Sequence, residues 1–250
     1  MVATAFCLEI RLVSAVVTNG FLTLDSLLAA ALYNRTGDLA VAHRDIPLQR
    51  EHEVWRGSTV FFSEPCFIVD VDRVASLKQR DDLSLGLYAP GPRGFTAIDQ
   101  RRGRYKASLD GYKGMSAEYA YYFGMGDAEA SRELIARWLP GLGKKHQSGC
   151  GEFESIVVRE LAVDRSWSSA GGTPTRPIPV ETWMAIGGRT DVATEDTAWM
   201  PPYSPSSSLW TADSVRRCVI PVERCVDAVG WCEREDADRN DQDDADGEDW

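Results

Sequence analysis

The sequence has few of the features that usually indicate a metal centre, a membrane segment or a secreted protein. It holds three histidines, and none of its six cysteines forms a C-x-x-C pair, so zinc-finger and zinc-ribbon spacings are absent. A site made from His43, His52 and His146 is arithmetically allowed, but we expect no metal and no cofactor. No apolar run approaches the ~20 residues that a membrane helix needs.

The remaining absences concern location. Residues 1–20 contain Glu9 and Arg11 and lack a basic start ahead of an apolar stretch, so they do not resemble a secretory signal. We therefore expect a cytoplasmic protein with no membrane contact. In that compartment the cysteines are expected to be free thiols.

The net charge of −11 is unevenly distributed along the 250 residues. Residues 233–250 contain ten acidic residues and two arginines and account for −8, which leaves −3 for residues 1–232. A terminal run of like charge is usually a solvated, disordered end. The alternative is a tail that competes electrostatically with RNA for basic patches.

Local patterns predict an α+β domain. Alternating apolar residues over 6–12 indicate a strand, and Asp25 is expected to cap a helix that ends at Gly37. Short strands are expected at 60–62 and 67–71. A second helix is expected from Asp127 to Trp138, and a last strand over 153–163.

This order of strand, helix, strand, strand, helix, strand is that of the ferredoxin-like (RRM-like) βαββαβ unit. We assign residues 1–170 to this domain, with a β-hairpin or thumb insertion at about 76–114. Residues 171–232 form a loop-rich C-terminal extension, with one further strand at 219–222. Residues 233–250 form an acidic disordered tail.

The insertion carries a basic cluster. Residues 76–113 hold eight Lys or Arg against four acidic residues. The densest part consists of Arg101, Arg102, Arg104, Tyr105 and Lys106. Arginines with interleaved tyrosine suit phosphate contacts and base stacking, although a solvated hairpin face is the simpler interpretation.

The most informative segment is the glycine-rich stretch between the second helix and the last strand. Gly141-Leu142-Gly143 and Gly149-Cys150-Gly151 flank five residues. These five are Lys144, Lys145, His146, Gln147 and Ser148. Glycines permit positive φ and close backbone approach, and lysines beside backbone N–H groups suit a phosphate chain. The simpler interpretation is a flexible connector.

Known phosphate-binding loops do not match this segment. A Walker A motif requires Gly-Lys-Ser/Thr four residues after a glycine, and no such sequence is present. A dinucleotide-binding fingerprint fails because His146 stands at the third glycine position and the loop follows a helix. The loop therefore indicates nucleic acid or a nucleotide without deciding between them.

The glycine pattern resembles the glycine-rich signature of the RAMP superfamily, which comprises CRISPR-associated RNA-binding proteins with ferredoxin-like folds. Gly141-Leu142-Gly143 and Gly149-Cys150-Gly151 match it if Cys150 takes the hydrophobic position. Residues 24–29 (LDSLLA), 46–48 (IPL) and 55–58 (WRGS) are similar to the Cas-five-type subunit of type IV CRISPR complexes.

The resemblance implies a non-enzymatic structural subunit of a defence ribonucleoprotein complex. Such a subunit caps the five-prime handle of the guide RNA (crRNA) and contacts backbone subunits and a large subunit. Target DNA is reached only indirectly, through the guide. The expected RNA-binding residues are the glycine loop (Gly141, Gly143, Lys144, Lys145, His146, Gln147, Ser148, Gly149, Gly151), the basic cluster (Arg101, Arg102, Arg104, Tyr105, Lys106) and Arg56 with Ser58.

Two alternatives remain open. A metal-independent endoribonuclease of the same superfamily would process precursor crRNA with His146, His43 or His52 as general acid or base. A nucleotide-binding regulatory protein would use the glycine loop for a small phosphate ligand.

Overall fold

The computed structural model describes residues 3–18, 20–75, 108–200 and 215–226. The chain divides into two compact units, residues 1–68 with 115–250, and residues 69–114. Most of the predicted insertion (76–107) and the acidic tail lie outside the described residues.

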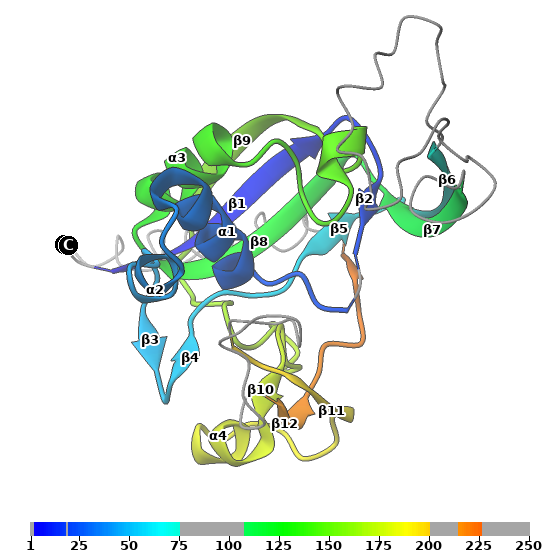
Figure 1. Cartoon of the computed structure of the whole chain (residues 1–250). Helices are drawn as coiled ribbons and strands as arrows, with labels where there is room; N and C mark the ends of the chain where they lie inside the picture. The colour runs from blue at the N-terminus through cyan, green and yellow to red at the C-terminus, as the bar shows by residue number, and fades with distance from the viewer. Residues whose placement is uncertain (1–2, 19, 76–107, 201–214, 227–250) are drawn as a thin grey trace, which may run out of the picture. The chain divides into compact units, whose positions relative to one another are not determined.

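A five-stranded sheet forms the centre of the first unit, with strand order β13-β5-β8-β1-β9 (Figure 1). Its strands are β1 (Thr4–Leu12), β5 (Phe61–Ser63), β8 (Tyr119–Gly126), β9 (Phe153–Glu160) and β13 (Cys225–Val226). β1 runs antiparallel to both β8 and β9, β8 runs antiparallel to β5, and β13 runs parallel to β5. With its helices, this unit has a mixed α+β architecture.

Two helices, α1 (Leu24–Thr36) and α3 (Ala128–Trp138), lie on one face of this sheet (Figure 1). A short helix, α2 (Leu39–Arg44), follows α1. Because side chains alternate along a strand, β1 sends Leu8 and Ile10 into the core with Leu28 of α1 and Ile135 of α3. On the other face, Cys7, Phe61, Tyr121 and Phe123 form a smaller buried cluster.

The helix boundaries confirm the prediction for α3 and correct one residue of α1. The Asp127 carboxylate accepts a hydrogen bond from the N–H of Ala130, and Gly37 ends α1 with φ +69°. The N-cap of α1 is Thr23, however, and the predicted cap Asp25 is a buried residue in its first turn.

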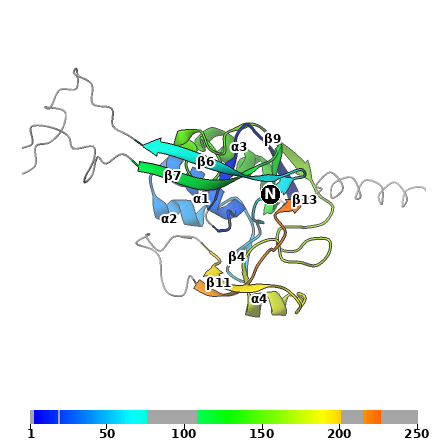
Figure 2. The same cartoon turned by 90° about the vertical axis from the view of Figure 1, so that its right-hand side faces the viewer.

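The strand predicted at 67–71 is present but belongs to another sheet. Residues 67–71 do form a strand, the first part of β6 (Phe67–Ala75), but β6 lies beside β7 (Ser108–Ser116) and not in the five-stranded sheet (Figure 2). Lys113 of β7 forms an ion pair with Asp70 of β6. In the five-stranded sheet, β8 lies between β5 and β1, and β9 ends at 160 instead of 163.

The C-terminal region has more regular structure than the predicted loops. β10 (Ile178–Pro179), α4 (Val180–Ala185), β11 (Thr194–Ala198) and β12 (Val215–Val219) follow in the chain, and the strands form a sheet in the order β10-β12-β11. The strand expected at 219–222 is wrong except at Val219, which is the last residue of β12, because residues 220–222 are not in a strand. Trp167, Trp183 and Trp199 lie in a second core with Val54, Ile178, Cys218 and Val219, while Trp210 lies outside the described residues.

Three short elements complete the first unit. β2 (Val16–Val17) follows β1, and β3 (Arg50–Glu51) pairs with β4 (Val54–Trp55) as a hairpin. The two turn residues of this hairpin, His52 and Glu53, have φ values of +48° and +64°.

Two cysteines correct the expectation of free thiols. Cys66 and Cys225 form a disulfide between residues 159 positions apart. The pairing of β13 with β5 brings the end of the described chain to the start of β6, which explains how two distant cysteines meet. Cys7, Cys150 and Cys218 are buried thiols outside this disulfide, and burial raises the pKa of Cys218 to about 12.

Candidate functional site

The glycine loop between α3 and β9 is fastened to the segment that follows β1. The N–H of Lys144 donates to the carbonyl of Val17 at 2.7 Å, and the N–H of Gly151 donates to Ala15 at 2.9 Å. The hydroxyl of Ser14 donates to the carbonyl of Gly149 at 2.7 Å. Both halves of the loop are thus tied to one neighbouring segment, and the five residues between the glycine pairs lie between these ties.

Close contact with the protein's own backbone explains most of the glycines in the loop. A Cβ on Gly151 would collide with the carbonyl of Leu142, and one on Gly143 would lie 2.5 Å from the carbonyl of Val17. Gly149 differs, because its φ is +82° and a Cβ there would meet no atom within 4 Å. Three glycines at 143, 149 and 151 therefore share a left-handed backbone, but only the surroundings of Gly149 are open.

Backbone N–H groups of the loop are largely engaged within the protein. Donors to carbonyl groups are Leu142, Lys144, Ser148, Gly149, Cys150 and Gly151. Leu142 is fully buried in the larger core and anchors the loop to it. These six amides cannot also bind a phosphate, so an anion at this loop would depend mainly on side chains.

The side chains between the glycine pairs lie at the surface. Lys144, Gln147 and Ser148 are exposed, and Lys145 and His146 are half-buried. Lys145 has φ +63° and precedes the turn η3 (His146–Ser148). The Nδ1 atom of His146 lies 3.2 Å from the carbonyl oxygen of Gly143, which orients the imidazole ring. The loop thus places two cations and one oriented imidazole on consecutive residues.

Arg56, the first of the two lower-ranked candidates, is engaged in structural contacts. Its guanidinium pairs with Glu51 and, at 2.9 Å, with Asp164, and it lies over the ring of Trp167 at 4.5 Å from the centroid. Two carboxylates already balance its charge, so its contribution to an RNA site would be small.

Ser58 is fully buried, and its hydroxyl accepts from the N–H of Phe123 at 2.9 Å and donates to the carbonyl of Thr59 at 2.8 Å. It offers no surface, and we leave it out of the site. The predicted basic cluster, Arg101, Arg102, Arg104, Tyr105 and Lys106, lies outside the described residues.

Sequence reasoning missed Arg176, the most densely bonded side chain described. It is fully buried, and its Nη1 atom lies 3.0 Å from a carboxylate oxygen of Asp25, which is also fully buried. The same guanidinium donates to the carbonyls of Trp55, Gly57 and Trp199 at 2.6, 3.0 and 2.8 Å. A lone arginine among prolines at 174–179 was the only signal in the sequence.

This arrangement joins segments on which the resemblance rests. Asp25 comes from the segment at 24–29, and Trp55 and Gly57 come from the segment at 55–58. The indole N–H of Trp167 also donates to the carbonyl of Trp55, at 3.0 Å. These residues therefore support the fold, and within the described part of the chain the glycine loop is the remaining candidate RNA contact.

The histidines belong to different elements. His43 lies in α2, His52 lies at the β3–β4 turn and His146 lies in the glycine loop. Burial lowers the pKa of His43. Within the part of the chain that the structure describes, no three His, Cys, Asp or Glu side chains form a group suited to a metal ion.

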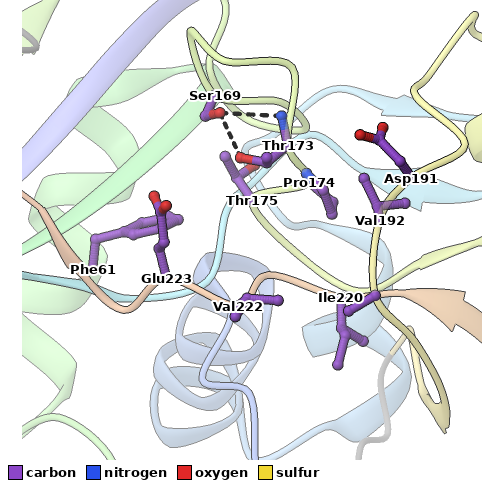
Figure 3. A pocket seen from close by; sticks show the side chains of 11 residues that line it. Phe61, Ser169, Thr173, Pro174, Thr175, Asp191, Val192, Ile220, Val222 and Glu223 are labelled. Carbon is purple, nitrogen blue, oxygen red and sulfur yellow. Dashed lines mark hydrogen bonds between the residues drawn. The ribbon is translucent and has the colours of Figure 1, made fainter.

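A cavity of about 150 Å³ lies beside the second core (Figure 3). The cavity is lined by the apolar residues Phe61, Ile220 and Val222 and by two acidic residues, Asp191 and Glu223. Asp191 is held by Arg189, whose Nε lies 2.9 Å from its oxygen. The carboxylates make this cavity unfavourable for a phosphate, so we do not assign it to RNA.

No protein-family model matches the chain, and no curated protein matches its sequence. Among the described residues, none of the helices is both long and apolar enough to span a membrane.

Proposed function

We propose that this chain is a guide-RNA-binding structural subunit of a type IV-like CRISPR ribonucleoprotein complex. In this proposal it caps the five-prime handle of the crRNA, contacts a backbone subunit, and catalyses no reaction. The observation that carries the proposal is the glycine loop. Its two ends are hydrogen-bonded to the segment that follows β1, and Lys144, Lys145 and His146 lie between these ends.

The sheet supports a ferredoxin-like assignment. Without β13, the strand order is β5-β8-β1-β9, in which the first and third strands of the βαββαβ unit lie at the centre. α1 connects β1 toward β5, α3 connects β8 to β9, and both helices lie on one face (Figure 1). These features are those expected of the split βαβ arrangement.

The loop would hold a phosphate by charge and not by a cradle of amides. Lys144 and Lys145 offer two ammonium groups, and Gln147 and Ser148 offer neutral hydrogen-bond donors beside them. Because the surrounding backbone is tied down, little conformational entropy is lost when the handle binds. Phosphate contacts of this kind give position and affinity rather than sequence preference.

The test is co-expression of the tagged chain with its genomic neighbours, followed by sequencing of the RNA that co-purifies. We expect short RNAs that share a repeat-derived five-prime handle. The variant Lys144→Ala/Lys145→Asn should lose them, since it removes two charges while asparagine tolerates the left-handed backbone at 145.

The matched control removes two charges elsewhere. Arg35 and Arg137 are exposed residues in the last turns of α1 and α3, so Arg35→Ala/Arg137→Ala should retain the RNA. Equal RNA loss in both double variants would indicate a general charge effect and count against the loop. A wild-type preparation without RNA would overturn the proposal and favour the nucleotide-binding regulator.

Salt dependence tests the phosphate contacts themselves. For handle RNA, the logarithm of affinity should fall against the logarithm of salt concentration by about 0.7 for each phosphate neutralised. The loop variant should have a slope smaller by about 1.4, corresponding to two contacts. A slope equal to that of the wild type would mean that the lysines make no phosphate contact.

The oriented imidazole of His146 supports one second candidate, a metal-independent endoribonuclease. If Nδ1 donates to the carbonyl of Gly143, Nε2 is left as a base. Cleavage of precursor crRNA in EDTA that disappears in His146→Ala would favour the nuclease. Cleavage that survives His146→Ala, His43→Ala and His52→Ala would point to a contaminant.

A further inference from the structure

The two edges of the five-stranded sheet differ. At the β5 edge, β13 adds a short parallel strand with Cys225 opposite Phe62 and Val226 opposite Ser63. At the other edge lies β9, eight residues long, and none of the strands in the described part of the chain pairs with its outer side. Among the described strands, a further strand therefore covers the β5 edge of the sheet and none covers the β9 edge.

The register identifies which groups of β9 face outward. The N–H of Leu161 donates to the carbonyl of Ala5 at 2.9 Å, in line with the pairing of β9 with β1. Successive residues of an antiparallel strand point their N–H and C=O groups to opposite sides. Residues 155, 157 and 159 thus face β1, and Ile156, Val158 and Glu160 present three N–H and three C=O groups outward.

β9 has few of the sequence features that prevent another strand from pairing with an edge strand. It contains neither proline nor glycine, and Val157 is 44% exposed on the face away from α3. The irregularity in its pairing lies at one end, opposite Arg11 and Leu12. Long, regular edge strands without proline or bulges readily accept another strand.

We propose that the β9 edge binds an extended segment of a partner protein as a sixth strand. The backbone pattern determines the conformation of this ligand, because only an extended chain matches alternate donors and acceptors. Glu152, Glu154 and Glu160 are exposed along the edge. Arg159 is paired with Glu9 at 3.1 Å and Glu154 is paired with Arg11 at 3.3 Å. The carboxylates of Glu152 and Glu160, one near each end of the edge, therefore favour a partner segment with Lys or Arg near both ends.

The same charges disfavour a second copy of this chain. The two antiparallel self-pairings with the longest overlap are centred on Ile156 and on Val157. They place Glu160 opposite Glu152 or opposite Glu154 of the other copy, and symmetry repeats the contact at both ends. Like charges directly opposite destabilise a strand pair, whereas a basic partner would replace both repulsions with attractions.

The test uses the full chain and a synthetic peptide of alternating Val and Thr with Lys at both ends. Binding should slow hydrogen exchange of the amides of Ile156, Val158 and Glu160, with little change at 155, 157 and 159. A version with Glu at both ends should bind about tenfold more weakly, from two cross-strand pairs. Protection at other residues, or equal binding of the two peptides, would overturn the proposal.

Backbone methylation provides a control that needs no change to the protein. Two peptides, N-methylated at odd or at even positions, have the same composition, but only one keeps the amides that face β9. We expect one to bind and the other to lose binding. Equal behaviour of the two would reject strand addition.

A variant of the protein gives the complementary result. Glu160→Pro removes one outward N–H, whereas Glu160→Gln removes only the charge. The proline variant should bind the Lys peptide less tightly than the glutamine variant, and equal affinities would contradict the proposal. RNA retention should not change in either variant, so failure here and failure of the guide-RNA proposal are distinguishable.

Discussion

Tyr122 is fully buried in the larger core, and its hydroxyl meets no hydrogen-bond partner among the described residues. A buried hydroxyl without a partner costs about 1–3 kcal/mol. We therefore expect Tyr122→Phe to raise the free energy of unfolding by about 1 kcal/mol, measured by urea denaturation. A decrease would show that the hydroxyl binds ordered water in solution.

The same residue should make stability depend on alkaline pH. Burial raises the pKa of Tyr122 well above its usual 10.0, so the folded state keeps the phenol neutral while the unfolded chain ionises. The contribution of this group to the free energy of unfolding is fully present below about pH 10 and decreases as the pH rises further. Unfolding free energies at about pH 8 and about pH 11 should therefore differ less in Tyr122→Phe than in the wild type.

Single residues were predicted well where their partners are local and poorly where they are distant. The cap of α3 by Asp127 depends on the N–H three residues later, and it was recognised. Asp25 has the same chemistry near the start of α1, but its partner Arg176 lies 151 residues away. An aspartate carboxylate can either cap a helix or form a buried ion pair, so the local sequence could not distinguish the two roles.

Within the glycine loop, two glycines provide a matched comparison. Gly151→Ala should lower the unfolding free energy by more than about 2 kcal/mol, since its Cβ collides with the carbonyl of Leu142 and its φ is +67°. Gly149→Ala should cost only about 1 kcal/mol, because its surroundings are open. Urea denaturation of both variants tests this, and equal losses would contradict the described packing of the loop.

The β3–β4 hairpin should be open to stabilisation. His52 and Glu53 both adopt positive φ at the turn, a conformation that Asn-Gly takes with less strain. We expect His52→Asn/Glu53→Gly to raise the thermal midpoint, with a gain of about 1 kcal/mol. A lower midpoint would show that the side chains of the turn make stabilising contacts.

The elements show the same division between local and distant information. α1 and α3 were located because apolar spacing, an N-terminal acidic residue and a terminal glycine or proline all lie within one segment. β8 was missed because its place beside β1 depends on residues more than 100 positions away. Residues 67–71 have the local pattern of a strand and lie closer to β1 in the sequence. The local pattern, however, does not show which strand pairs with β1.

For the molecule as a whole, Arg176 is the residue whose loss should matter most to stability. It joins the start of α1, the end of β4 and the chain at Trp199. Removing one partner of a buried ion pair typically costs about 3–5 kcal/mol. We expect Arg176→Met to lower the free energy of unfolding by this amount, measured by urea denaturation.

The double variant Arg176→Met/Asp25→Leu is the control for that loss. It removes the unpaired carboxylate and should recover part of the stability, while the carbonyls of Trp55 and Gly57 remain without their donor. No recovery at all would mean that the carbonyl contacts, and not the ion pair, account for the effect. Lys144→Ala should leave stability unchanged in the same assay.

The disulfide between Cys66 and Cys225 turns the chain between them into a covalent ring. The second unit, the glycine loop, β9 and the entire C-terminal sheet (β10, β11 and β12) belong to this ring. A protease that cuts the ring once releases no fragment and adds only one water to the mass. The nicked molecule would separate into two pieces on a denaturing gel only after a thiol reductant opens the bond.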